Sequence, residues 1–349
     1  MPFLNNAVNR CRIKNFDVDH FKIVLMNSLK YITVPNFASE DGKISADVTL
    51  SYQVFGQELH SAPVVLINHA LTGNSDVAGE FGWWKSIVGD SKLIDTEKYT
   101  VMAFDIPGNG YKTTEILFEY DAFSARDIAK LFGLAVQQLQ ISSLYAAIGS
   151  SLGGGIAWEM AVLFPDLIEN LIPVASDWKA SDWVLGHNKV QFQILENSKK
   201  PLHDARMMAM LFYRSPASFQ SRFNRTVNTN LGMYNIESWL LHHGEKLESR
   251  FTLHAYKVMT HLLSSVDISK KFVGIEEALS TLKSKVIMIG IDSDLFFVAS
   301  DNKETAKLLD QQHKEVDYKE IKSIHGHDAF LIEFEQLVEA LSDVFKYKI

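Results

Sequence analysis

The chain has 349 residues, of which 47% are hydrophobic and 22% charged, as in a globular protein with a sizeable core. Its net charge is −8 and it has no basic run, which argues against nucleic acid as a partner, because phosphate binding needs a clustered basic surface. The single cysteine, Cys11, excludes an internal disulfide framework and favours a reducing compartment. The N-terminus lacks the apolar stretch of a secretory signal, and no apolar run approaches the roughly 18 residues of a membrane span, so we expect a cytoplasmic protein without a membrane partner.

The first half of the chain alternates between strand and helix patterns. Period-two alternation indicates the early strands, and later apolar runs end in polar or glycine-rich residues, as buried parallel strands do. The predicted elements are strands within 20–56, at 63–70 and at 99–110, a helix at 124–141 with Ser124 as its N-cap, a strand at 143–149, a helix at 153–164 and a strand at 167–176. This alternation predicts an α/β fold with a parallel sheet and right-handed crossovers.

The alternation stops at about Trp178, and the chain stays helical in pattern to about Phe272. Strand patterns return at 284–292 and 316–324 with a helix over 302–312 between them, and a helix is predicted at 333–347. We therefore expect one α/β core, formed by residues 1–177 and 273–349, with a helical cap inserted at 178–272.

The most informative local motif is Gly149-Ser150-Ser151-Leu152-Gly153, which fits G-x-S-x-G with Ser151 at its centre. A predicted strand precedes the motif and a predicted helix follows it, as a nucleophile elbow requires. The glycines remove Cβ clashes in the sharp turn, and the helix N-terminus favours negative charge beside the serine. The alternative is a glycine-rich turn without chemistry.

A nucleophilic serine needs a base and an acid that orients the base, and on this kind of sheet both follow the serine in the order acid, then histidine. Asp292 and Asp294 follow the strand at 284–292, and His327 precedes the last predicted helix. His325 is the nearest competing histidine and is explained equally well as a loop hydrogen-bonding residue.

Backbone amides are the expected oxyanion donors. Leu152 follows the nucleophile directly, and Leu71 lies in the turn after the early strand. His69 in the same turn is expected to shape the loop. Histidine pairs such as 242–243 are too closely spaced and lack partners for a metal site, and no glycine-rich nucleotide-binding motif occurs, so no metal or permanently bound cofactor is predicted.

Seven segments together resemble the homoserine O-acyltransferases of methionine biosynthesis. They are HALTG (69–73), the GWWKSIVGDSKLIDTEKYTV block (82–101), GSSLGG (149–154), ARMMAMLFYRS (205–215), HHGEKLESRF (242–251), SDLFF (293–297) and GHDAFL (326–331). The similarity extends from about residue 45 to the C-terminus. It implies an α/β-hydrolase-fold transferase that uses acetyl-CoA or succinyl-CoA as co-substrate and tends to pair as a homodimer through its cap helices.

The resemblance also implies roles for individual residues. Ser151 matches the nucleophile, Asp294 the triad acid in preference to Asp292, and His327 the base. Arg206 and Tyr213 match residues that face the amino-acid substrate, and Asp328 matches the carboxylate that holds its ammonium group. The seven-residue spacing places Arg206 and Tyr213 on one helix face. Without the resemblance, Arg206 is better explained as part of a salt bridge between helices, and Tyr213 as a phenol buried in the core.

The chain departs from the family pattern in three places. The segment before the 205–215 helix is shortened to 194–204, the turn after the 99–110 strand reads DIPGNGYKTT, and Thr252-Leu253-His254-Ala255 precedes Tyr256. These changes affect substrate identity more than catalysis. The predicted reaction is a ping-pong acyl transfer from acyl-CoA, most simply acetyl-CoA, to homoserine. The alternatives are an esterase or thioesterase of the same fold, a transferase for serine or another hydroxy amino acid, and a non-catalytic binding protein.

Overall fold

A computed structural model describes residues 29–112 and 118–346. Cys11 and the part of the predicted strand region before residue 29 lie outside these residues. Among the helices that are described, none combines the length and the apolar character needed to cross a bilayer.

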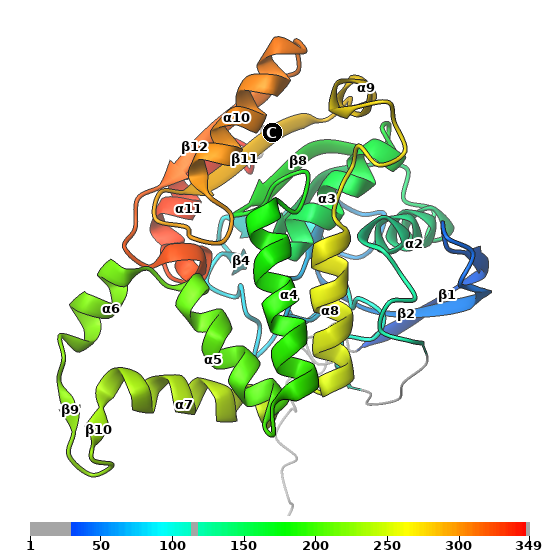
Figure 1. Cartoon of the computed structure of the whole chain (residues 1–349). Coiled ribbons are helices and arrows are strands. Elements are labelled where there is room, and N and C mark those ends of the chain that lie inside the picture. The colour runs from blue at the N-terminus through cyan, green and yellow to red at the C-terminus, as the bar shows by residue number, and fades with distance from the viewer. Residues whose placement is uncertain (1–28, 113–117, 347–349) are drawn as a thin grey trace, which may run out of the picture.

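An eight-stranded sheet in the order β1-β2-β6-β3-β7-β8-β11-β12 forms the centre of the described structure (Figure 1). Its strands are β1 (Lys30–Ala38), β2 (Ser45–Gly56), β3 (Val64–Asn68), β6 (Thr100–Phe104), β7 (Leu144–Ser150), β8 (Ile168–Val174), β11 (Lys285–Ile291) and β12 (Val316–Ile321). The pairs β1–β2 and β2–β6 are antiparallel, and every later pair is parallel. The predicted α/β fold with a mostly parallel sheet is confirmed.

Helices cover the sheet. They are α2 (Ala125–Gln138), α3 (Leu152–Leu163), α9 (Ile275–Ser280), α10 (Ala299–Gln311), the 3-10 turn η1 (Gly326–Leu331) and α11 (Phe334–Leu341). All but α9 and η1 lie where the patterns predict a helix. Ser124 caps α2, and Asp127 completes a reciprocal capping box. The helix predicted at 333–347 was too long. It ends at Leu341, since Phe345 then turns into the core against Tyr99 and Tyr145.

Five helices and a small hairpin lie between β8 and α9, on the side of the molecule where α4 and α8 run next to each other (Figure 1). They are α4 (Asp182–Asn197), α5 (Pro201–Tyr213), α6 (Pro216–Phe223), the hairpin β9 (Val227–Asn228) and β10 (Met233–Tyr234), α7 (Asn235–Glu248) and α8 (Leu253–Ser265). The all-helical prediction missed this hairpin, whose turn places Gly232 at φ +64°. The boundaries of the cap at 178 and 272 stay a prediction.

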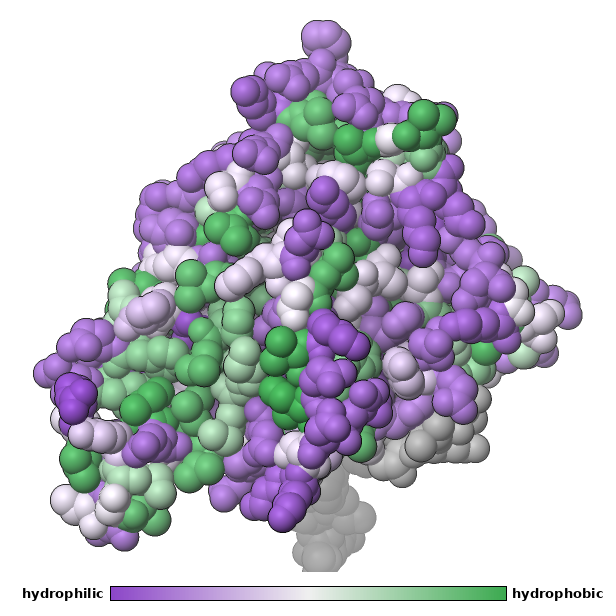
Figure 2. Space-filling model, viewed as in Figure 1, coloured by the Kyte–Doolittle hydropathy of each residue, from purple (hydrophilic) through white to green (hydrophobic). Residues whose placement is uncertain are grey.

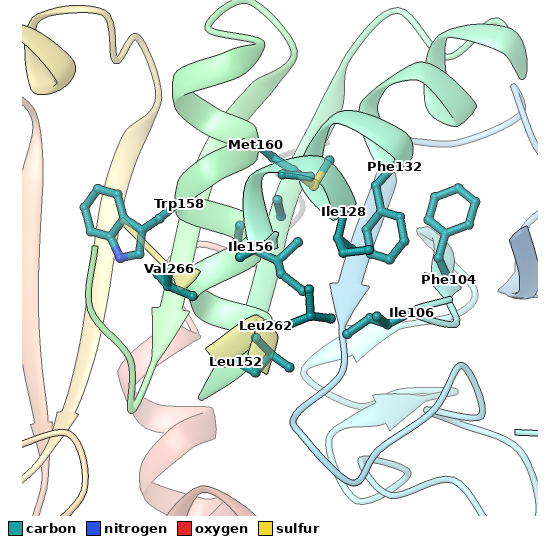
Figure 3. Close-up of a cluster of buried hydrophobic side chains, with 14 of the residues drawn as sticks. Phe104, Ile106, Ile128, Phe132, Leu152, Ile156, Trp158, Met160, Leu262 and Val266 are labelled. Carbon is teal, nitrogen blue, oxygen red and sulfur yellow. The ribbon is translucent and has the colours of Figure 1, made fainter. Parts of the chain in front are cut away.

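Helix α3 is buried nearly all round, which fixes the start of the helix beneath the site. Figure 3 shows Leu152, Ile156 and Met160 in a cluster with Phe132 of α2 and Leu262 of α8. The three α3 side chains are fully buried. A further parallel pair, β4 (Val88–Gly89) with β5 (Ile94–Asp95), lies outside the main sheet.

Candidate active site

The turn from β7 into α3 holds Ser151 in a backbone conformation that non-glycine residues rarely adopt, with φ 53° and ψ −122°. Such conformations cost about 1–3 kcal/mol and persist only where the surroundings enforce them. Close packing enforces it here. A Cβ added to Gly149 would lie 2.1 Å from the Gly153 carbonyl oxygen, and one added to Gly153 would lie 2.2 Å from the Asn68 carbonyl oxygen of β3. The G-x-S-x-G segment therefore forms the sharp elbow that its spacing predicts.

The structure brings Ser151, His327 and Asp294 together from three separate elements. Ser151 Oγ lies 2.9 Å from His327 Nε2, and His327 Nδ1 lies 2.7 Å from Asp294 Oδ2. All three residues are buried. In this arrangement the imidazole can accept the serine proton at Nε2 while Nδ1–H donates to the carboxylate. The geometry is that of a nucleophile, base and acid, and the catalytic roles stay predictions.

Asp294 is oriented by the backbone that follows it. Its Oδ1 accepts hydrogen bonds from the amides of Phe296 and Phe297 at 2.7 and 3.0 Å, which leaves Oδ2 for His327. Both carboxylate oxygens are thus occupied, so the side chain holds one rotamer.

Aromatic rings surround the His327 imidazole. The centroids of Tyr213, Phe296, Phe297 and Phe330 lie 5.6, 5.2, 5.8 and 5.5 Å from its own centroid. Sequence reasoning used the apolar-aromatic pair after Asp294 only to choose the acid and missed the packing of Phe296 and Phe297. The signal was the double phenylalanine that begins two residues after a predicted triad residue.

The residues that competed for catalytic roles have structural partners instead. Asp292 Oδ1 accepts from the Ser323 amide at 2.9 Å, and His325 Nδ1 lies 3.1 Å from Ser218 Oγ. The alternative role given to His325, a loop hydrogen-bonding residue, is the one that its geometry supports. Ser150 is fully buried, and its Oγ has no hydrogen-bond partner among the described residues.

The turn after β3 is organised by His69, as expected. Its Nδ1 lies 2.8 Å from the Ala70 carbonyl oxygen, and its Nε2 accepts from the Ile106 amide at 3.1 Å. Burial lowers the pKa of His69, so the neutral ring that this pattern requires is favoured. The amides of Leu71 and Leu152 have no acceptor within the described part of the chain. Their proposed oxyanion role is compatible with this and stays a prediction.

The three residues predicted to meet the amino acid lie around the histidine-bearing turn. The Arg206 guanidinium lies 5.5 Å from the Tyr213 ring centroid, so the two share a helix face. Tyr213 is buried, and burial raises the pKa of its phenol. Asp328 Oδ2 lies 3.8 Å from Arg214 Nη1, and burial raises the pKa of its carboxyl although Arg206 opposes this. Arg206 forms no ion pair with a carboxylate of the described residues, so the salt-bridge alternative is not seen there.

Two of the three departures from the family pattern meet at one cavity of about 580 Å³. It lies between the turn at 106–111 and the start of α8, where His254 lines it. Asp47, Asp105 and Glu119 are the acidic residues of its lining, and they disfavour the phosphate groups of CoA.

One acidic group among the described residues has the spacing of metal ligands. Asp90, Asp95 and Glu97 bring one carboxylate oxygen each within 4.8 Å of the others. Asp95 already pairs with Lys98 at 2.9 Å and accepts the amides of Ser91 and Glu97. These contacts explain the cluster as a turn-stabilising group on the β4–β5 connection.

The chain is similar to known proteins over most of its length. Residues 63–320 match the family model described as alpha/beta hydrolase fold. The chain is 31% identical to a homoserine O-acetyltransferase of Cyclobacterium marinum, with 95% of this chain and 98% of that protein covered. It is 30% identical to one of Carboxydothermus hydrogenoformans, with 91% and 95% covered.

Solved structures agree on the fold. The homoserine O-acetyltransferase from Bacillus anthracis superposes with a TM-score of 0.84 at 21% identity, covering 93% of this chain and 99% of that chain. Esterase E22 superposes with a TM-score of 0.82 at 19% identity, covering 92% and 100%.

Proposed function

The chain belongs to the homoserine O-acetyltransferases of the alpha/beta hydrolase fold family and is thus an acyltransferase, and we propose that it moves an acetyl group from acetyl-CoA to the hydroxyl of L-homoserine. The hydrogen-bonded chain from Ser151 through His327 to Asp294 carries this proposal. The reaction would serve methionine biosynthesis in the cytoplasm. Succinyl-CoA is the alternative donor.

In the first half-reaction, His327 accepts the Ser151 proton as Oγ attacks the thioester carbonyl carbon. The Leu71 and Leu152 amides stabilise the oxyanion of the tetrahedral intermediate. Its collapse breaks the carbon–sulfur bond, and CoA leaves with the proton that His327 returns. Asp294 stabilises the imidazolium and holds its tautomer.

In the second half-reaction, His327 accepts the proton of the amino acid's hydroxyl, whose oxygen attacks the acyl carbonyl carbon. Collapse of the second tetrahedral intermediate breaks the bond between that carbon and Ser151 Oγ, and His327 returns the proton to Oγ as the O-acyl amino acid leaves. Water is the competing nucleophile. Ser151 is only 4% exposed and His327 3%, so the reacting atoms are shielded from bulk solvent. Orientation of the acceptor by Arg206, Tyr213 and Asp328 then favours transfer over hydrolysis.

The charge of the cap supports an anionic donor. In a chain of net charge −8, residues 178–272 carry 13 lysines and arginines against 7 aspartates and glutamates. Burial, followed by the neighbouring Arg206, lowers the pKa of His243 to about 4, and Lys246 and Arg214 add to this effect. These cations favour approach of the CoA phosphates to the cap.

An esterase or thioesterase is the main rival, because it would use the same triad. A mass-spectrometric test separates the steps. Incubation with acetyl-CoA alone should add one acetyl group to the peptide that contains Ser151, and homoserine should remove it much faster than water does. Absence of the adduct in the wild type together with active transfer would exclude the seryl intermediate.

We further propose that two copies pair through their cap helices. Apolar side chains are exposed on this part of the chain, and Figure 2 shows apolar residues gathered over the cap. They include Trp183, Leu185, Val190, Leu211 and Leu231. Contiguous exposed apolar surface of this kind is typical of protein interfaces.

A further inference from the structure

We infer that Arg214 is a second guanidinium of the acceptor site and binds the α-carboxylate of the amino acid. The inference rests on the proposed function and extends it, since it restricts the acceptor to a hydroxy amino acid with a free carboxylate. Arg206 was predicted to face the substrate, whereas Arg214, in the same matching segment 205–215, was given no role.

Arg214 lies where the cap meets the turn that carries the catalytic histidine. It ends α5, and its amide donates to the Met210 carbonyl at 3.2 Å. The backbone contact is close, because a Cβ added to Gly326 would lie 3.0 Å from the Arg214 carbonyl carbon. Ser215 Oγ also donates to the Ile324 carbonyl. The backbone at Arg214 is therefore anchored to the turn that carries His327, and its guanidinium lies 3.8 Å from Asp328 of that turn.

The guanidinium is buried without a hydrogen-bond acceptor among the described residues. Arg214 is 8% exposed, and its buried Nε has no partner. Its one ion pair, Nη1 to Asp328 Oδ2, spans 3.8 Å, which is too long for a hydrogen bond. Leaving a buried donor unsatisfied costs about 1–3 kcal/mol, and more for a charged group.

A second buried arginine shows how this chain satisfies a structural guanidinium. Arg126 is 7% exposed, and it donates from Nε to Glu40 at 3.0 Å and from Nη1 to Glu159 at 2.8 Å. Arg214 has the same burial without such contacts. The difference points to an anionic ligand that completes its coordination.

The local charges select the chemistry of that ligand. Arg206 and Arg214 provide two cations near one carboxylate, Asp328, which can take up an ammonium group. A zwitterionic amino acid matches this set, because a guanidinium fork pairs with a carboxylate in two parallel hydrogen bonds. The donor's diphosphate does not fit this position, since it lies at the far end of the pantetheine arm from the thioester, whereas Arg214 is buried next to Asp328, the neighbour of His327 in the sequence.

A competing explanation is that Arg214 only positions Asp328. The two explanations differ in which part of the acceptor they involve. Binding of the carboxylate couples Arg214 to that group of the substrate, whereas positioning of Asp328 couples it to the ammonium group. Acceptors that lack one group or the other therefore distinguish them.

The experiment measures kcat/KM of Arg214→Met and Arg214→Lys for three acceptors with acetyl-CoA as donor. Homoserine has both groups, 3-aminopropan-1-ol lacks the carboxylate, and 4-hydroxybutyrate lacks the ammonium group. Arg225→Met is the matched control, since Arg225 is an exposed cap arginine that stacks on Tyr234. The burst amplitude with p-nitrophenyl acetate counts the intact active sites in each variant. If Arg214→Met proves to be misfolded by this measure, the comparison of acceptors is made with Arg214→Lys.

We expect Arg214→Met to lose about 10- to 150-fold with homoserine, the range for a charged hydrogen bond. The loss should be similar with 4-hydroxybutyrate and less than about threefold with 3-aminopropan-1-ol. Arg214→Lys should lose less than Arg214→Met, because it keeps the charge without the fork. Equal losses with homoserine and 3-aminopropan-1-ol would overturn the inference. A wild type that homoserine does not stimulate over water would instead refute the proposed function itself.

Discussion

At the residue scale, the orientation of His327 depends on a carboxylate that is held from both sides. Asp294 accepts two backbone amides on Oδ1 and the imidazole on Oδ2. Asp292, two residues earlier, is bound to the Ser323 amide instead. The same side-chain chemistry thus serves a catalytic geometry at one position and a loop at the other.

This contrast predicts the outcome of paired substitutions. Asp294→Asn should lower the rate of Ser151 acylation by about 10⁴-fold, because the amide favours the wrong imidazole tautomer. Asp292→Asn should change it less than about threefold. Pre-steady-state bursts with p-nitrophenyl acetate measure both. Equal losses in the two variants would show that the acid has been assigned wrongly.

Residue order along the chain predicted that Ser151 and His327 meet one of two aspartates, because parallel strands present their carboxyl ends at one edge. Only the family resemblance chose Asp294 over Asp292. The packing around them was not predictable. Phe297 and Tyr213 reach His327 from segments far away in the sequence, and no local periodicity encodes such a contact. The unpartnered state of Arg214 likewise appears only in three dimensions.

At the element scale, the elbow depends on the close approach of α3 to β3. A methyl group at Gly153 would lie 2.2 Å from the Asn68 carbonyl oxygen, where backbone has to shift to admit it. Gly186 in α4 has no atom within 4 Å of such a methyl group. Substitutions of these two helical glycines therefore form a matched pair, in which only the one at Gly153 brings a methyl group against backbone.

Gly153→Ala should lower the free energy of unfolding by about 1–3 kcal/mol through overpacking, and should also reduce the burst by moving Ser151. Gly186→Ala should raise stability by about 0.5–1 kcal/mol, because alanine is the better helix former. Urea denaturation measures both effects. A Gly153 variant of unchanged stability and burst would contradict the close-approach account.

Asp177, three residues after the end of β8, makes the free energy of unfolding depend on pH. Asp177 is buried and accepts from Thr305 at 2.8 Å, and burial raises its pKa from 3.8 to about 6. The folded state therefore binds more protons than the unfolded chain between these values, and this contribution to stability falls as pH rises from about 4 to 6.

Asp177→Asn should remove that slope. Relative to the wild type, the variant should gain up to about 3 kcal/mol between pH 4 and pH 7, the free-energy equivalent of the shift. Urea unfolding at several pH values provides the measurement. A constant difference between variant and wild type across this range would show that Asp177 does not titrate there.

Most elements could be predicted from hydrophobic periodicity, and Ser124 fixed the start of α2. The failures have physical causes. The β9–β10 hairpin has two residues per strand, too short for a period-two pattern to appear. The last helix ends early because burial of Phe345 outweighs helical continuation.

At the scale of the whole molecule, the exposed apolar side chains of the cap bear on assembly. Leu211 on α5 is 45% exposed, and Trp183 on α4 is 54% exposed. Val273, after the cap, is 99% exposed and serves as a control.

Sedimentation velocity at micromolar concentration should give the mass of a dimer for the wild type. Leu211→Glu should shift the mass toward that of the monomer, because it places a charge in the buried interface. Val273→Glu should remain dimeric. A monomeric wild type would refute pairing through the cap.

The proposed function depends on homoserine being the nucleophile that attacks the acyl-enzyme. The most direct test is the steady-state rate of CoA release from acetyl-CoA, measured with homoserine, with serine and with neither. The account predicts strong stimulation by homoserine, weak stimulation by serine and slow release in water. Release that is steady in water and unchanged by homoserine would contradict it and identify a thioesterase.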